Sequence, residues 1–218
     1  MKDCRLFSAV KSISSVQITK AHGLLGHGLL LFILCFAGAS VESAELQSPE
    51  NLVKNIRQGG YVLYLRHSMS DRTQIDEDTD NLNDCSNQRN LSEQGREQAR
   101  GIGAAIRDLN IPIGTVMTSP YCRCVDTGQL AFGRGEESND LRFTISTDER
   151  ETQRLADALK RLLASRPAAG TNTVLIAHTG NLKEAAGVWP KPEGALHVFR
   201  PLGKEGFEHL GRIVPEQW

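Results

Sequence analysis

Residues 61–67, YVLYLRH, and residues 173–178, TVLIAH, decide the fold class of this chain. Each stretch opens with five mostly apolar residues, a run that is typical of a short strand buried on both faces of a sheet. The first run is followed by Arg66 and His67, and the second by His178. In parallel α/β sheets, ligands bind beyond the carboxyl ends of the strands. We therefore expect these polar residues to lie in one crevice.

The segments around the two runs alternate between helical and strand patterns. Ser92 is a typical helix cap, and Ala99, Ile102 and Ile106 share one face of the helix predicted after it, which ends near Leu109. The other expected elements are a helix from Ser48-Pro49 to Gly59-Gly60, strands at 114–118 and 141–146, helices at 120–133 and 155–163, and a closing hairpin of 195–201 and 207–214. Residues 68–90 are polar and without periodicity, which predicts a long loop. The alternation predicts an α/β sandwich around a largely parallel sheet.

A third polar group, Arg123, follows the predicted strand that ends at Thr118. An imidazole can attack phosphorus and carry the phosphoryl group as a covalent intermediate. Arginine suits the charge of that group because its planar fork donates two hydrogen bonds to phosphate. Two histidines and two arginines at strand ends therefore predict a phosphate site, although an Arg-His pair alone is a weak motif.

Four stretches in this order and spacing are more specific: LYLRHSMSD (63–71), NLSEQGREQARGIGAAI (90–106), VMTSPYCRCVDTGQLAFG (116–133) and NTVLIAHTGNL (172–182). Together they resemble the histidine phosphatase superfamily, which is phosphoglycerate mutase-like. The resemblance implies a three-layer α/β/α sandwich and His67 as the phosphate-accepting nucleophile. It also implies that Arg66, Arg123 and His178 are catalytic and bind the phosphoryl group. It implies no metal site and no cofactor.

The chain departs from the family pattern in ways that bear on its branch. Thr179 follows the second histidine, where the larger branch has aspartate, so the chain resembles the branch without the His-Asp motif. That branch often takes its proton donor from the region after the second arginine. Asp148, Glu149 and Glu151 lie there, but a charged helix start explains them equally well. The general acid stays unassigned among these three or none.

The first 45 residues differ from the rest. Basic residues precede an apolar run at 24–37, and small residues follow it, as in a secretory signal peptide. We predict a signal peptide at 1–39, with cleavage alternatives up to residue 44, and a single domain at 45–218. An uncleaved anchor is the competing interpretation. Cleavage would leave no stable membrane span and would place the protein in the periplasm or outside the cell.

The cysteines and the overall charge narrow the function further. After cleavage three cysteines remain, and an oxidising compartment would let Cys85 pair with Cys122 or Cys124. The net charge of −1 shows no basic excess for nucleic acid. The spacing of the cysteines and histidines predicts no metal site.

We therefore expect an exported phosphatase that hydrolyses a phosphomonoester or a phosphohistidine through a phosphohistidine on His67. Its ligand would be a small phosphorylated molecule, and its oligomeric state is open. One alternative is a non-catalytic module that binds phosphate or a phospho-sugar. A phosphoglycerate mutase-type phosphotransferase is less favoured, because export would separate it from its substrates and the sequence shows no clear cluster of further basic residues.

Overall fold

A computed structural model describes residues 46–145 and 147–218. The predicted signal peptide at 1–39 and its alternative cleavage sites up to residue 44 lie outside the described residues. Within the described part of the chain, no helix has both the length and the apolar character needed to cross a bilayer.

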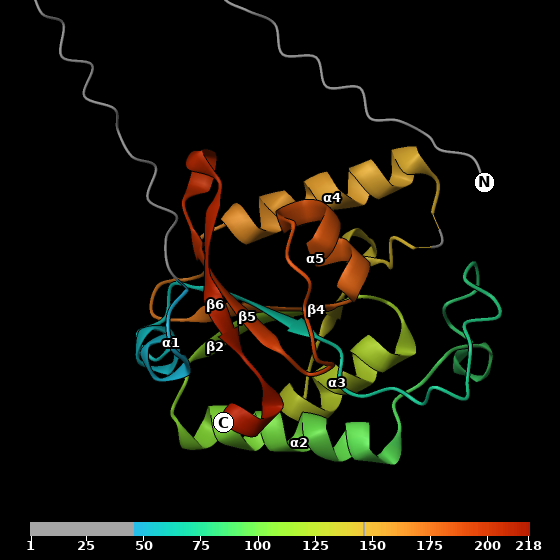
Figure 1. Ribbon diagram of the computed structural model, residues 1–218, viewed down its shortest axis with the longest axis horizontal. Helices are drawn as coiled ribbons and strands as arrows, with labels where there is room; N and C mark the ends of the chain where they lie inside the picture. Colours follow the sequence, from blue (N-terminus) through green and yellow to red (C-terminus); the bar gives the residue numbers. More distant parts are fainter. Residues whose placement is uncertain (1–45, 146) are drawn as a thin grey trace, which may run out of the picture. The chain divides into compact units, whose positions relative to one another are not determined.

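The centre of the fold is a six-stranded sheet, ordered β3-β2-β4-β1-β5-β6 among the described residues (Figure 1). Its parallel part consists of β1 (Val62–Arg66), β2 (Ile113–Thr118), β3 (Glu136–Glu137) and β4 (Asn172–Ala177). The hairpin of β5 (Leu196–Pro201) and β6 (Phe207–Ile213) adds two antiparallel strands beside β1. The predicted largely parallel sheet is confirmed.

Helices cover both faces of this sheet and complete three layers (Figure 1). One apolar core lies under α1 (Pro49–Ile56), α2 (Glu93–Asp108) and α3 (Cys122–Phe132), and the other under α4 (Glu149–Ala164) and α5 (Thr179–Ala186). On β1, Leu63 and Leu65 enter the first core, whereas Val62 and Tyr64 enter the second. The strand is buried on both faces, which explains why its sequence is apolar without alternation.

The segment after His67 packs tightly against the start of α2. Ser92 caps the helix by accepting a hydrogen bond from the Gly95 amide at 3.0 Å. A Cβ atom at Gly95 would collide with the carbonyl oxygen of Met69, so this approach requires glycine. The contact holds the start of the loop that follows His67 against the start of α2.

The strand predicted at 141–146 is wrong over its described residues. A short 3₁₀ helix, Asn139–Leu141, occupies its start, and residues 142–145 form no strand. Leu141 is buried in the second core, and the Asn181 side chain donates to the carbonyl oxygen of Arg142 at 2.6 Å. This side-chain hydrogen bond satisfies a backbone carbonyl group that would otherwise bond to a neighbouring strand. The edge strand is instead the two-residue β3, whose exposed glutamates gave no apolar signal.

Candidate functional site

The carboxyl ends of three adjacent strands bring the predicted polar residues together. Strand β4 lies between β1 and β2, and all three run parallel. The His67 amide donates to the carbonyl oxygen of Ala177 at 3.0 Å, which ties the end of β1 to the end of β4. In the same way, the amide of Ser119, which follows the end of β2, donates to the carbonyl oxygen of Ile176 at 2.8 Å. The segments that carry Arg66, His67, Arg123 and His178 therefore leave the sheet side by side.

A hydrogen bond to the neighbouring backbone fixes the orientation of the His67 imidazole. Its Nδ1 lies 2.9 Å from the carbonyl oxygen of Ser68, so Nδ1 carries the proton and donates it there. The other ring nitrogen, Nε2, is left with its lone pair. Burial, followed by the positive charges of Arg123 and Arg66, lowers the pKa of His67 well below its ordinary value. The ring is neutral at physiological pH, as an attacking nitrogen requires.

His178 faces His67, with 5.4 Å between the ring centroids. It occupies the N-cap position of α5, and its Nε2 lies 2.8 Å from the Ser119 hydroxyl. Its ring lies 4.7 Å from the ring of Phe143, tilted by 32°. Burial, then Arg123 and then His67, lower the pKa of His178 well below its ordinary value.

The two predicted arginines are held in place, but some of their N–H groups have no hydrogen-bond acceptor among the described residues. Arg123 is fully buried, and its Nη1 donates to Asp76 at 2.8 Å. Arg66 donates to the carbonyl oxygen of Pro190 and pairs with Glu193 at 3.2 Å. Among the described residues, no acceptor reaches Nε of Arg66 or Nε and Nη2 of Arg123, although these atoms are buried. Buried donors of this kind are suited to an anion.

A third arginine, Arg89, belongs to the same site and was missed in the sequence. It lies close enough to contribute to the lowered pKa of both His67 and His178. Its carbonyl oxygen accepts from Arg123, and its buried Nε has no acceptor among the described residues. The residue stands at the end of the aperiodic loop 68–90, where no pattern separates it from an ordinary surface arginine. Only the R-N-L-S run into the α2 cap could have drawn attention to it.

A disulfide fastens this loop to the start of α3. Cys85 pairs with Cys122, which settles the choice that the spacing left open. The Cys122 amide also donates to the Gln88 side chain at 3.0 Å. Cys124 is a free, buried thiol, and burial raises its pKa to about 12. The bridge therefore holds the residues around Arg89 against the helix turn that carries Arg123.

The three acidic candidates for a proton donor serve the start of α4. Asp148 caps that helix by accepting from the Glu151 amide at 2.8 Å. Glu151 pairs with Arg154 at 2.8 Å, and Glu149 is exposed in the first turn. No contact with either site histidine involves them among the described residues. The interpretation as a charged helix start accounts for all three.

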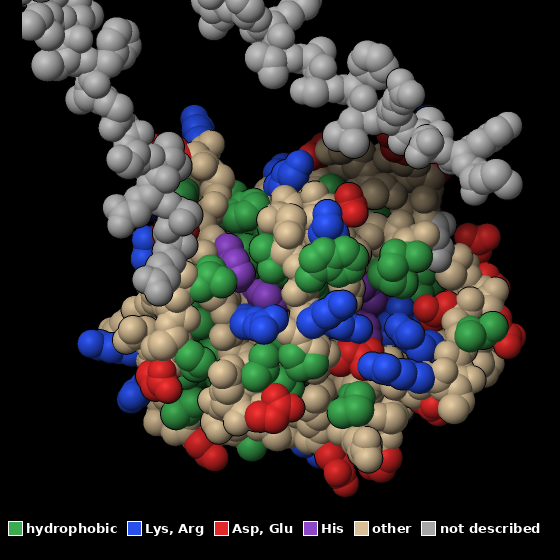
Figure 2. Space-filling view, in the orientation of Figure 1, with side chains coloured by type: hydrophobic (Ala, Val, Ile, Leu, Met, Phe, Trp, Pro, Cys, Tyr) green, Lys and Arg blue, Asp and Glu red, His purple; other side chains and the backbone are tan. Residues whose placement is uncertain are grey.

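Basic side chains from separate segments surround a cavity beside Arg66. It measures about 680 Å³, and Arg66, Arg72, Lys191 and Arg212 line it together with two glutamates and other residues. Lysine and arginine side chains gather across the middle of the face seen in Figure 2, with histidine visible among them. The sequence shows no clear cluster of this kind, because the four residues come from three distant stretches of the chain.

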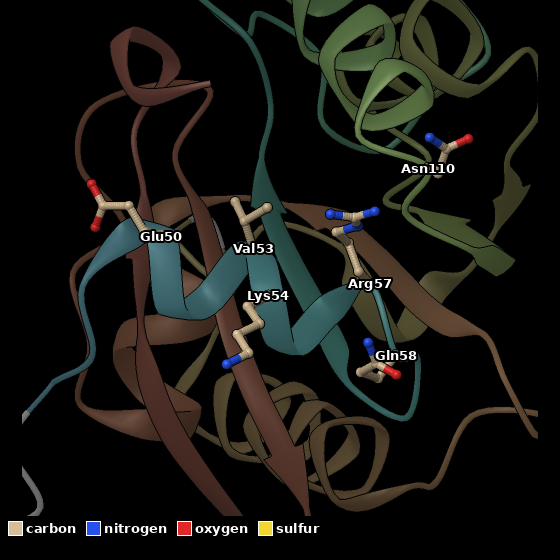
Figure 3. A pocket seen from close by; sticks show the side chains of 6 residues that line it. All are labelled: Glu50, Val53, Lys54, Arg57, Gln58 and Asn110. Atoms are coloured by element: carbon tan, nitrogen blue, oxygen red, sulfur yellow. The ribbon is translucent and has the colours of Figure 1, made fainter.

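A smaller pocket, of about 310 Å³, lies on α1 near the amino ends of the strands (Figure 3). Its side chains come from α1, from the two residues after it and from Asn110, which precedes β2. It contains none of the four predicted site residues. Among residues 46–145 and 147–218, no group of three or more His, Cys, Asp or Glu side chains is placed to hold a metal ion.

Comparisons with known proteins agree with the family resemblance of the sequence. The family model described as histidine phosphatase superfamily (branch 1) matches residues 65–151, so the resemblance seen in the sequence is confirmed. No curated protein sequence matches the chain.

Three solved structures are among those similar to this chain, each with a TM-score below 0.5. The protein histidine phosphatase SixA complexed with tungstate is 15% identical with a TM-score of 0.47, over 71% of this chain and 97% of that one. The H9A mutant of phosphoserine phosphatase from Entamoeba histolytica, in complex with phosphoserine, is 10% identical with a TM-score of 0.49, over 72% and 98%. The ecdysone phosphate phosphatase from Bombix mori, in complex with tungstate, is 17% identical with a TM-score of 0.49, over 69% and 91%.

Proposed function

We propose that this chain, which matches the histidine phosphatase superfamily (branch 1) model over residues 65–151, is a phosphatase that hydrolyses a phosphomonoester or a phosphohistidine. The observation that carries this proposal is the pairing of a neutral, oriented His67 with three arginines whose buried nitrogens have no acceptor among the described residues. A nucleophile and an anion-binding site thus meet at one point.

The reaction takes two displacements at phosphorus. Nε2 of His67 attacks, so an N–P bond forms while the bond from phosphorus to the leaving oxygen or nitrogen breaks. The departing atom takes up a proton, and the phosphoryl group stays on the imidazole. Water then attacks phosphorus, the N–P bond breaks, and orthophosphate leaves with His67 neutral again. Splitting the hydrolysis in this way replaces one difficult step with two easier ones.

Fixed positive charge stabilises the transferred group in both steps. The unpartnered nitrogens of Arg66, Arg89 and Arg123 are suited to its equatorial oxygens. The amino ends of α3 and α5 also begin at the site, and the positive end of a helix favours an anion. The guanidinium groups supply the charge that a metal supplies in other phosphatases, so we propose a reaction independent of metal ions.

We also propose that the protein acts outside the cytoplasm, in the periplasm or secreted. The signal-like sequence at 1–39 supports this location. The Cys85–Cys122 bridge supports it independently, because disulfides persist mainly in oxidising compartments. The bridge lies beside Arg123, so an oxidising environment would maintain the site.

The proposal is tested by turnover of 4-nitrophenyl phosphate by the purified protein. We expect release of orthophosphate, undiminished by EDTA, and inhibition by vanadate. Loss of activity on chelation, restored by a divalent ion, would contradict metal independence. Binding of orthophosphate or vanadate without turnover of this ester or of a phosphohistidine peptide would instead identify a non-catalytic binding module.

The lowered pKa values of His67 and His178 predict that both rings stay neutral at pH 6.0, where an exposed histidine is mostly protonated. Because the folded-state pKa lies below the unfolded value of about 6.5, the two rings stabilise the fold above that pH, and this contribution is lost as the pH falls. Imidazole ¹⁵N–¹H spectra, assigned with His67→Gln and His178→Gln variants, should show neutral rings, with His67 protonated on Nδ1. Charged-ring shifts at pH 6.0 would contradict this.

A further inference from the structure

The cavity beside Arg66 is larger than a phosphoryl group requires. Its volume of about 680 Å³ lies within the range of about 300–1,000 Å³ that is usual for small-molecule sites. Arg66 belongs to both the phosphoryl site and the cavity, because it directly precedes His67 in the sequence and also lines the cavity. A molecule whose phosphoryl group sits at His67 would therefore extend its remaining part into this space.

The charges that line the cavity are unbalanced. Glu193 is already engaged, because its Oε1 accepts from the Ser70 hydroxyl at 2.8 Å and pairs with Arg66 at 3.2 Å. Within the described part of the chain, Arg72, Lys191 and Arg212 form no ion pair. Three cations thus face one remaining carboxylate, that of Glu216.

These cations are arranged by the fold rather than by sequence neighbourhood. Arg212 projects from β6 and donates from Nη1 to the carbonyl oxygen of Lys191 at 2.8 Å, which holds the two residues together. Arg72 belongs to the loop that follows His67. The end of β1, the start of β5 and the end of β6 lie at the same edge of the sheet. The cluster therefore lies at the edge that carries the nucleophile, and an anion bound there would be close to the transferred group.

We propose that this cavity is a second anion subsite and that the substrate is a small phosphorylated acid. The phosphoryl group would occupy the His67 site, and a second anionic group, a carboxylate or another phosphate, would bind Arg72, Lys191 and Arg212. This inference rests on the proposed phosphatase function for its first site. The second group adds affinity and orients the leaving group, and because the cations are exposed, its effect weakens with salt.

Non-hydrolysable phosphonates test the subsite without relying on turnover. Calorimetry would compare 3-phosphonopropanoate and 5-phosphonopentanoate with their uncharged amides and with 1,3-propanediyl bisphosphonate. We expect at least one acid to bind the wild type about fivefold or more tightly than its amide, and 0.5 M NaCl to reduce that ratio. Preference for the carboxylate or for the bisphosphonate identifies the second group.

The double variant Arg72→Gln/Arg212→Gln should bring the ratio of acid to amide affinity close to one. Arg150→Gln/Arg161→Gln is the matched control, because it removes the same charge from exposed positions on α4. Equal binding of acid and amide at both lengths, or a preference that survives the Arg72/Arg212 change, would overturn the subsite. Failure of the proposed function would appear separately, as absence of 4-nitrophenyl phosphate turnover, while the phosphonate comparison would still decide the subsite.

Discussion

Replacement of His67 by alanine is expected to lower kcat for 4-nitrophenyl phosphate by about 10⁵-fold or more, as loss of a nucleophile does in other covalent enzymes. Alanine removes the proposed phosphoryl acceptor, the Nε2 left unprotonated by the bond from Nδ1 to the carbonyl oxygen of Ser68. Steady-state kinetics at saturating ester measures the loss. The arginines remain, so orthophosphate should still bind to the variant.

His209→Gln is the matched control for this change. His209 lies on β6, where its Nε2 contacts the His197 ring at 3.0 Å, outside the site at the ends of β1, β2 and β4. Its loss should leave kcat within about twofold of the wild type, as is usual for residues remote from chemistry. Wild-type turnover by a folded His67→Ala protein would show that another group receives the phosphate.

Replacement of Arg123 by alanine is expected to lower kcat/KM by about 10²- to 10³-fold, the usual effect of removing one fixed donor to a developing charge. Two of its buried nitrogens have no acceptor among the described residues, and its charge contributes to the lowered pKa of both imidazoles. Vanadate inhibition should weaken in parallel, because vanadate resembles the transferred group. The measurement is kcat/KM together with the vanadate inhibition constant.

Arg123 is also a structural residue, so a second variant separates the two roles. Its removal leaves the Asp76 carboxylate without its partner at 2.8 Å, and the melting temperature should fall. Arg123→Ala/Asp76→Asn removes that unpaired charge and should recover much of the lost melting temperature without recovering kcat/KM. Recovery of kcat/KM together with the melting temperature would show that Arg123 acts through the fold alone.

The sequence was sufficient for the central part of the site because the determining signals are local. The apolar runs before Arg66 and His178 are buried on both faces of the sheet, and the rule that ligands bind at the carboxyl ends of parallel strands then places the residues that follow. The 5.4 Å between the His67 and His178 rings confirms that the two strand ends meet. Their catalytic roles stay predictions.

Other parts of the site could not be predicted, because long-range packing alone brings them together. Arg89 lies near the histidines on a loop that the Cys85–Cys122 bridge and the contact of Arg123 with the Arg89 backbone hold in place. The basic cluster at the cavity is formed by the loop after β1, the turn before β5 and strand β6. The lack of such a cluster in the sequence was one of two reasons for disfavouring a phosphoglycerate mutase-type phosphotransferase, and the structure removes that reason. The other reason, predicted export, remains.

The most direct test of the central claim is to trap the intermediate. The wild type would be mixed with a ³²P-labelled phosphate ester, quenched in alkali within milliseconds, digested and analysed by mass spectrometry. We predict phosphate that is stable to alkali and labile to acid on the peptide containing His67, and none on that peptide from His67→Ala. Phosphate on a different residue, or steady hydrolysis with no labelled protein at any time point, would contradict the account.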